Sequence, residues 1–78
     1  MNLEMDKSEI FRTNVRNAMD AKSISITELA RRIGTARPTM SRVLSGSEAV
    51  TLERADRIAH AVGERLESLL IEPSLQHA

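Results

Sequence analysis

One break in the middle of the chain constrains its fold more than any other feature. Gly34 and Pro38 stand four residues apart within "ITELARRIGTARPTMSRVL", between two stretches that each keep helical apolar spacing. Glycine enters the left-handed conformation that ends a helix without a Cβ penalty, and proline is tolerated in a first helical turn, where its missing N–H is no loss. The pair therefore predicts two short helices that cross at a steep angle instead of one long amphipathic helix.

Capping residues and turn signals divide the rest of the sequence into three further helices, and no alternating pattern marks a strand. Asp6 or Ser8 caps a first helix that ends near residues 22–23. Ser25 and Glu28 have the spacing of a capping box at the start of the second helix.

The second half of the chain carries the same kinds of signal. Gly46 ends the third helix, Thr51 caps a fourth that Gly63 ends, and a last short helix covers roughly residues 65–71 before Pro73. We therefore expect an all-α fold of five helices. Its expected parts are a flexible arm over residues 1–7, one domain over residues 8–71 and a tail over residues 72–78. The predicted core consists of apolar residues at helical spacing: Phe11, Val15, Ala18, Met19, Leu29, Ala30, Ile33, Met40, Val43, Leu44, Leu52, Ala55, Ile58, Ala59 and Val62.

Composition argues against several classes of protein. A chain of 78 residues has little room for a large catalytic cavity, and without cysteine it forms neither disulfides nor a thiolate zinc site. His60 and His77 lack metal-ligand spacing, and no serine stands in a G-x-S-x-G context. We therefore expect no enzyme, no metal and no cofactor. The absence of cysteine, of a long apolar run and of a signal peptide predicts a soluble protein of the cytoplasm.

Charge is unevenly distributed, although the formal net charge is zero. Residues 22–46 carry five basic side chains and one acidic side chain, a net charge of +4, whereas residues 1–21 sum to −1 and residues 47–78 to −3. A solvated helical face explains this distribution as well as a polyanion-binding surface does. A polyanion would meet the middle of the chain, where the outer side of the third helix projects Arg37 and Arg42.

The residues around the break resemble the helix-turn-helix domain of phage repressors and Cro proteins, the lambda repressor-like or XRE family. The match runs through "ITELARRIGTARPTMSRV", continues through "VTLERADRIAHAVGERLESLL", and covers roughly residues 8–71. The family's apolar and glycine positions are occupied by Leu29, Ala30, Ile33, Gly34, Met40 and Val43. The resemblance implies a bacterial or phage regulator of transcription that binds a specific operator in double-stranded DNA as a homodimer, with the third helix in the major groove.

The chain departs from the family pattern at three places. Ile26 stands where many members carry a phosphate-binding glutamine, so backbone N–H groups, Thr27 or nearby arginines must hold the phosphate instead. Met19 and Leu44 stand where many members pair an arginine with a glutamate, and an apolar pair of similar volume can replace such an ion pair. Pro38 replaces a hydrogen-bonding side chain and offers only apolar contact, for instance to a thymine methyl.

The resemblance implies two sets of DNA-contacting residues. Those expected to read base edges are Arg37, Pro38, Thr39, Ser41 and Arg42. Those expected to contact phosphates are Thr27, Arg31, Thr35, Ser45 and Ser47. Arg32, beside Arg31, is expected to act through its charge rather than to read bases.

The C-terminal end carries more apolar residues than a short helix needs to close a monomer core, which predicts a dimer interface. Its expected residues are Leu66, Leu69, Leu70, Ile71 and Leu75, of which Leu70 and Ile71 are preferred. The alternative is that all of them fold back onto the first and fourth helices. With no second domain visible, we expect a Cro-like or controller-type repressor. The rival from another class is an antitoxin that binds a toxin protein and its own operator.

Overall fold

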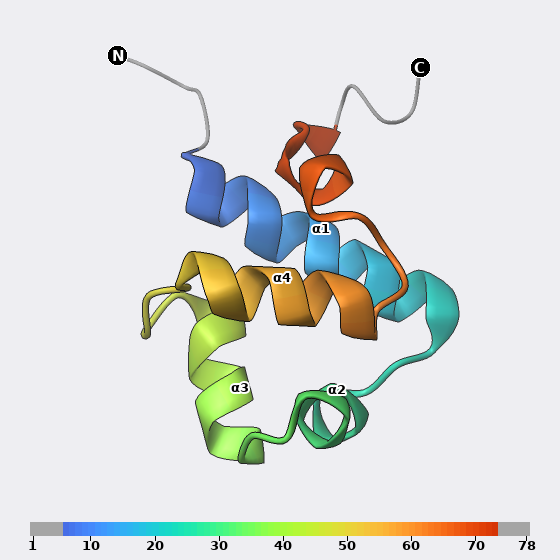
Figure 1. Cartoon of the computed structure of the whole chain (residues 1–78), viewed down its shortest axis with the longest axis vertical. Coiled ribbons are helices and arrows are strands. Elements are labelled where there is room, and N and C mark those ends of the chain that lie inside the picture. Colours follow the sequence, from blue (N-terminus) through green and yellow to red (C-terminus); the bar gives the residue numbers. More distant parts are fainter. Residues whose placement is uncertain (1–5, 74–78) are drawn as a thin grey trace.

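The structure, a computed structural model, describes residues 6–73 of the chain (Figure 1). Its α-helices are α1 (Lys7–Lys22), α2 (Ile26–Ile33), α3 (Arg37–Ser45) and α4 (Leu52–Ala61). The 3₁₀-helix η1 (Leu66–Leu70) follows α4, and no strand occurs in the described residues. The all-α prediction is therefore confirmed, but the last of the five expected helices is a short 3₁₀-helix and not an α-helix.

Polar side chains begin three of the α-helices. Asp6 caps α1 by accepting a hydrogen bond from the N–H of Glu9 at 2.8 Å. Ser25 and Thr51 cap α2 and α4 in the same way, as predicted. The capping box at α2 is only half formed, because the carboxylate of Glu28 binds two arginines of α2 instead of returning to the N–H of Ser25.

The break at Gly34 and Pro38 separates α2 from α3 in the predicted way. Gly34 adopts the left-handed conformation with φ of +73°, and its N–H donates to carbonyl oxygens of the last turn of α2. Pro38 lies in the first turn of α3, which begins one residue earlier at Arg37. The two helices run in different directions (Figure 1), and α2 also packs against α4 while α3 contacts α1.

The core lies where the inner faces of the helices meet. Its most completely buried side chains are Val15, Leu29, Met40, Val43, Ile58 and Val62. The predicted core residues are buried with two exceptions: Ala18 is half-buried, and Leu52 is 76% exposed. The prediction for Leu52 is wrong because this residue begins α4. The inner face of α4 starts one turn later at Ala55, and Val50 packs against the core from the preceding loop.

A buried asparagine joins the C-terminal segment to α1. Nδ2 of Asn14 donates to the carbonyl oxygens of Leu69 at 2.9 Å and Ile71 at 2.7 Å. An α-helix through this segment would pair the carbonyl of Leu69 with the N–H of Pro73, and proline has none. Asn14 satisfies that carbonyl from another element and so holds the end of η1 on α1.

Candidate nucleic-acid interface

The helix α3 has a buried side and an exposed side. Met40, Val43 and Leu44 are buried and hold it on the core. Of the predicted base-reading residues, Arg37, Pro38 and Arg42 are exposed. Thr39 and Ser41 are half-buried, and Ser41 lines a hollow together with Leu44. The helix lies at the edge of the molecule (Figure 1) and has 9 residues. With its side chains an α-helix is about 10–12 Å across, which matches the width of a major groove, about 12 Å.

Arg37 connects α3 to the helix before it. Its Nε donates to Oγ1 of Thr27 at 3.1 Å, and both side chains are exposed. The structure therefore brings together one residue predicted to read bases and one predicted to contact a phosphate. Both groups lie near the N-terminal end of α3. Thr35 precedes this end, in the turn between α2 and α3.

Arg42 has two side-chain partners. Its Nε donates to Oε1 of Glu48 at 3.3 Å, and its Nη2 donates to Oγ1 of Thr39 at 3.3 Å. Glu48 also accepts a hydrogen bond at Oε2 from Nη1 of Arg54, at 2.9 Å. The hydrogen bond from Arg54, followed by that from Arg42, lowers the pKa of the Glu48 carboxyl group. Glu48 is therefore an anion at neutral pH, held between two arginines.

Sequence reasoning missed Glu48 and Arg54. The sequence feature that could have revealed the contact between Arg42 and Glu48 is Gly46. This glycine has φ of +91° and ends α3 in a turn. In this turn the N–H groups of Gly46, Ser47 and Glu48 all donate to the carbonyl oxygen of Arg42. An acidic residue two positions after such a glycine is thereby brought beside the last turn of the helix.

Ser45 and Ser47 meet at the same end of α3. Their hydroxyl oxygens lie 3.1 Å apart, and Oγ of Ser45 donates to the carbonyl oxygen of Arg42 at 3.1 Å. Both serines are exposed. Two of the residues predicted to contact phosphates therefore lie side by side at the C-terminal end of α3, whereas Thr27 and Thr35 lie near its N-terminal end.

The arginines of α2 are partly neutralised by one carboxylate. Nη2 of Arg31 lies 2.7 Å from Oε2 of Glu28, and Nε of Arg32 lies 2.9 Å from the same oxygen. The hydrogen bond from Arg31, followed by that from Arg32, lowers the pKa of Glu28. Arg32 also donates to the carbonyl oxygen of Ala61 in α4, whereas the Arg31 side chain is 73% exposed. Of the two, Arg31 is thus better placed to meet an anion in solution.

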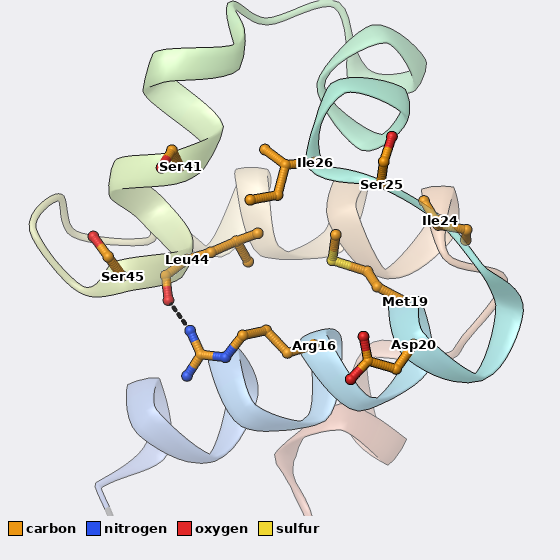
Figure 2. Close-up of a pocket in the computed structure, with 9 residues that line it drawn as sticks. All are labelled: Arg16, Met19, Asp20, Ile24, Ser25, Ile26, Ser41, Leu44 and Ser45. Atoms are coloured by element: carbon orange, nitrogen blue, oxygen red, sulfur yellow. Dashed lines mark hydrogen bonds between the residues drawn. The ribbon is translucent and has the colours of Figure 1, made fainter.

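A hollow of about 430 Å³ lies between α1, the start of α2 and α3 (Figure 2). Met19 and Leu44 both line it and are buried, which agrees with the expected apolar pair. Ile26 points into the same hollow (Figure 2). Arg16, which sequence reasoning missed, donates from Nη1 to the main-chain carbonyl oxygen of Leu44 and so ties α1 to the last turn of α3.

The apolar residues of the C-terminal segment lie at different depths. Leu69 is 3% exposed and belongs to the core of the single chain, so its side chain is not available to a partner. Leu66 and Leu70 are half-buried and line a shallow hollow together with Leu52, and Ile71 is 45% exposed. Leu75 lies outside the described residues.

The described surface offers guanidinium groups and hydroxyl groups beside α3. Between residues 6 and 73, His, Cys, Asp and Glu side chains nowhere gather in threes that could hold a metal ion. None of the helices in this part of the chain is long and apolar enough to span a bilayer. The groups around α3 are donors of the kind that bind phosphates and base edges.

Comparison with known protein families agrees with this geometry. The family model of the Cro/C1-type HTH (helix-turn-helix) DNA-binding domain matches residues 14–72. Curated protein sequences gave no match to the chain, and neither did solved structures. The matched region includes all of α2, α3, α4 and η1 and most of α1. The chain therefore belongs to the Cro/C1-type helix-turn-helix family of DNA-binding domains.

Proposed function

We propose that this protein regulates transcription by binding a specific operator in double-stranded DNA, with the exposed side of α3 in the major groove. The observation that carries the proposal is the position of Arg37 and Arg42. Both side chains are exposed on a helix that buried side chains hold on the core. Such a helix can enter a groove without any loss of buried apolar surface.

Base reading is assigned to the exposed side of α3. An arginine that donates two hydrogen bonds to O6 and N7 of guanine discriminates against other bases by about 1–3 kcal/mol. Arg37 and Arg42 are the proposed guanine readers. Thr39 and Ser41 are proposed to bond neighbouring base edges, and Pro38 is proposed to contact a thymine methyl group.

Phosphate contacts are assigned to both ends of α3 and to α2. The proposed side chains are Thr27, Arg31, Thr35, Ser45 and Ser47. At the start of α2, Ser25 already accepts the N–H of Glu28. The N–H groups of Ile26 and Thr27 belong to the first turn, which has no intrahelical acceptors, and they are proposed to hold a phosphate where Ile26 replaces the family's glutamine.

We further propose a Cro-like or controller-type repressor that acts as a homodimer in the cytoplasm and catalyses no reaction. Leu66, Leu70 and Ile71 remain the proposed interface. Leu52 joins them because it is 76% exposed and lines a hollow with Leu66 and Leu70. Leu69 is left out because it is buried in the core.

Selection of DNA fragments from a random double-stranded pool tests the proposal. Repeated rounds should enrich one sequence that contains guanines at defined positions. When Arg37 or Arg42 is replaced, the position that it reads should accept other bases as well. The affinity for this operator should exceed the affinity for a scrambled duplex at the same salt concentration, by about a thousandfold or more. Recovery of unrelated sequences with equal affinity would contradict sequence-specific binding.

A further inference from the structure

We infer that Glu48 is a specificity-determining residue that acts through Arg42, by holding its guanidinium group in the orientation that reads one base pair. This inference rests on the proposed function, because it assumes that Arg42 faces a base edge. Glu48 itself contacts no DNA in this arrangement. It is a positioning residue.

The position of Glu48 is fixed from two sides. Its backbone N–H donates to the carbonyl oxygen of Arg42 at 3.2 Å, so the turn after α3 sets its place relative to that helix. Its carboxylate is bound at 2.9 Å by Arg54, a residue of α4 whose side chain is only 33% exposed. The carboxylate thus connects α4 to the exposed side of α3.

The remaining donors of Arg42 point to how it reads a base. A guanidinium group has five N–H donors. Glu48 accepts from Nε at 3.3 Å, and Thr39 accepts from Nη2 at 3.3 Å. Three N–H donors are left, two on Nη1 and one on Nη2, and one donor from each nitrogen can bind the O6 and N7 acceptors of guanine. An arginine oriented before binding loses less side-chain freedom when it binds.

The charge of Glu48 acts in a second way. A carboxylate near the DNA backbone repels phosphates whatever the base sequence, and added salt screens this repulsion. Removal of the charge should therefore strengthen binding to every duplex, whereas loss of the Nε contact should weaken discrimination at one base pair only. The two effects can be separated.

The test compares Glu48→Gln, Arg42→Ala and the double variant on a set of duplexes. The set contains the selected operator and every single base-pair substitution of it. Arg42→Ala identifies the base pair that Arg42 reads. At that base pair, Glu48→Gln should reduce discrimination by about three- to tenfold. In the Arg42→Ala background the same substitution should leave discrimination unchanged.

Two controls accompany the test. Glu53→Gln removes the same charge from an exposed site in the first turn of α4 and should leave discrimination unchanged at every base pair. The Nε–H resonance of Arg42 in an amide-type NMR spectrum of the free protein should exchange faster with water in Glu48→Gln than in the parent, because its acceptor is weakened. Melting temperatures establish that each variant is folded.

The outcomes distinguish the inference from the proposed function. If Arg42→Ala reduces discrimination and Glu48→Gln does not, the positioning role of Glu48 is wrong while base reading by Arg42 stands. If Glu48→Gln raises affinity for every duplex alike and leaves discrimination unchanged, Glu48 acts through its charge alone, and the inference is overturned. If Arg42→Ala changes discrimination nowhere, both the assigned reader and the inference fail.

Discussion

Arg37 and Arg42 carry the same guanidinium group, but their partners differ in charge. Arg37 donates from Nε to the neutral hydroxyl of Thr27, whereas Arg42 donates from Nε to the carboxylate of Glu48. A charged acceptor restrains a guanidinium group more strongly than a neutral one. We therefore expect Arg42 to meet a base in one orientation, and Arg37 to adjust more readily to the DNA that it meets.

Replacing either arginine by alanine should weaken binding to the selected operator by about 1–3 kcal/mol, because each substitution removes a proposed bidentate contact to a base. Both side chains are exposed, so the melting temperature should change little. Fluorescence anisotropy with the operator and with a scrambled duplex measures the loss of specific binding. If both variants bind the operator as tightly as the parent, α3 is not the reading helix.

Sequence could predict the exposed residues of α3 but not all of their partners. The helical period separates Arg42 from the buried Met40 and Val43, and the structure agrees. Arg37 stands three residues before Met40, on the same side by the period, and it is exposed as the first residue of α3. Arg42 and Glu48 are six residues apart across a turn, and this spacing has no meaning within a helix. Such contacts depend on turn geometry and on tertiary packing, which one sequence does not reveal.

The sharp end of α2 depends on one glycine. Gly34 has φ of +73°, and a Cβ added there would meet no atom within 4 Å. Gly34→Ala should therefore destabilise the protein by about 1–2 kcal/mol through backbone strain alone. Gly34→Asn should cost less, since asparagine tolerates this conformation better. Chemical denaturation of the two variants measures the difference. Equal stabilities of the alanine and asparagine variants would contradict backbone strain as the cause of the loss.

The apolar pair of Met19 in α1 and Leu44 in α3 can be tested by introducing the arginine and the glutamate that many family members carry at these two positions. Met19 is 6% exposed and Leu44 is 3% exposed. Leu44→Glu buries a carboxylate at this contact and should cost about 2–4 kcal/mol of unfolding free energy. Met19→Arg in the same chain should recover part of that loss by restoring an ion pair.

Thermal unfolding of the single and double variants measures the coupling between the two positions. Arg16 already lies beside this contact, but it donates to the main-chain carbonyl of Leu44 and not to its side chain. Met19→Arg alone serves as the control for the cost of the new arginine. An unchanged melting temperature in Leu44→Glu would contradict the packing of these two residues against each other.

Helix boundaries were predictable where they depend on local signals. Asp6, Ser25 and Thr51 begin helices and Gly34 ends one, because capping and backbone freedom involve only neighbouring residues. The type of η1 was not predictable in this way. Its last carbonyl oxygens are bound by Asn14 of α1, more than fifty residues away along the chain, and local signals do not reveal such a contact.

At the scale of the whole molecule, one copy presents one reading helix. The molecule extends 36 × 25 × 19 Å, and half-sites on one side of B-DNA are spaced about 34–36 Å apart. Since each copy has one α3, we expect a single copy to read one half-site only. The few contacts of α3 seldom give tight specific binding alone, and a second copy would supply the same contacts at the next half-site.

Leu52 and Ile71 are the sites at which to test the proposed dimer. They are 76% and 45% exposed, so a charge there is solvated in a single chain but would be desolvated in an interface. Leu70 is less suitable because it is half-buried and packs against the core. A charge at Leu70 would change the stability of the monomer together with its association.

Leu52→Glu and Ile71→Lys, made separately, should each shift the protein from dimer to monomer. Light scattering at micromolar concentration should report about twice the chain mass of 8.7 kDa for the parent, and values closer to one chain mass for the variants. Helix content should stay constant while operator affinity falls, because the half-sites are no longer bound together. His60→Lys, on an exposed position of α4, should remain dimeric. A parent protein that is monomeric both free and on its operator would overturn the proposed interface.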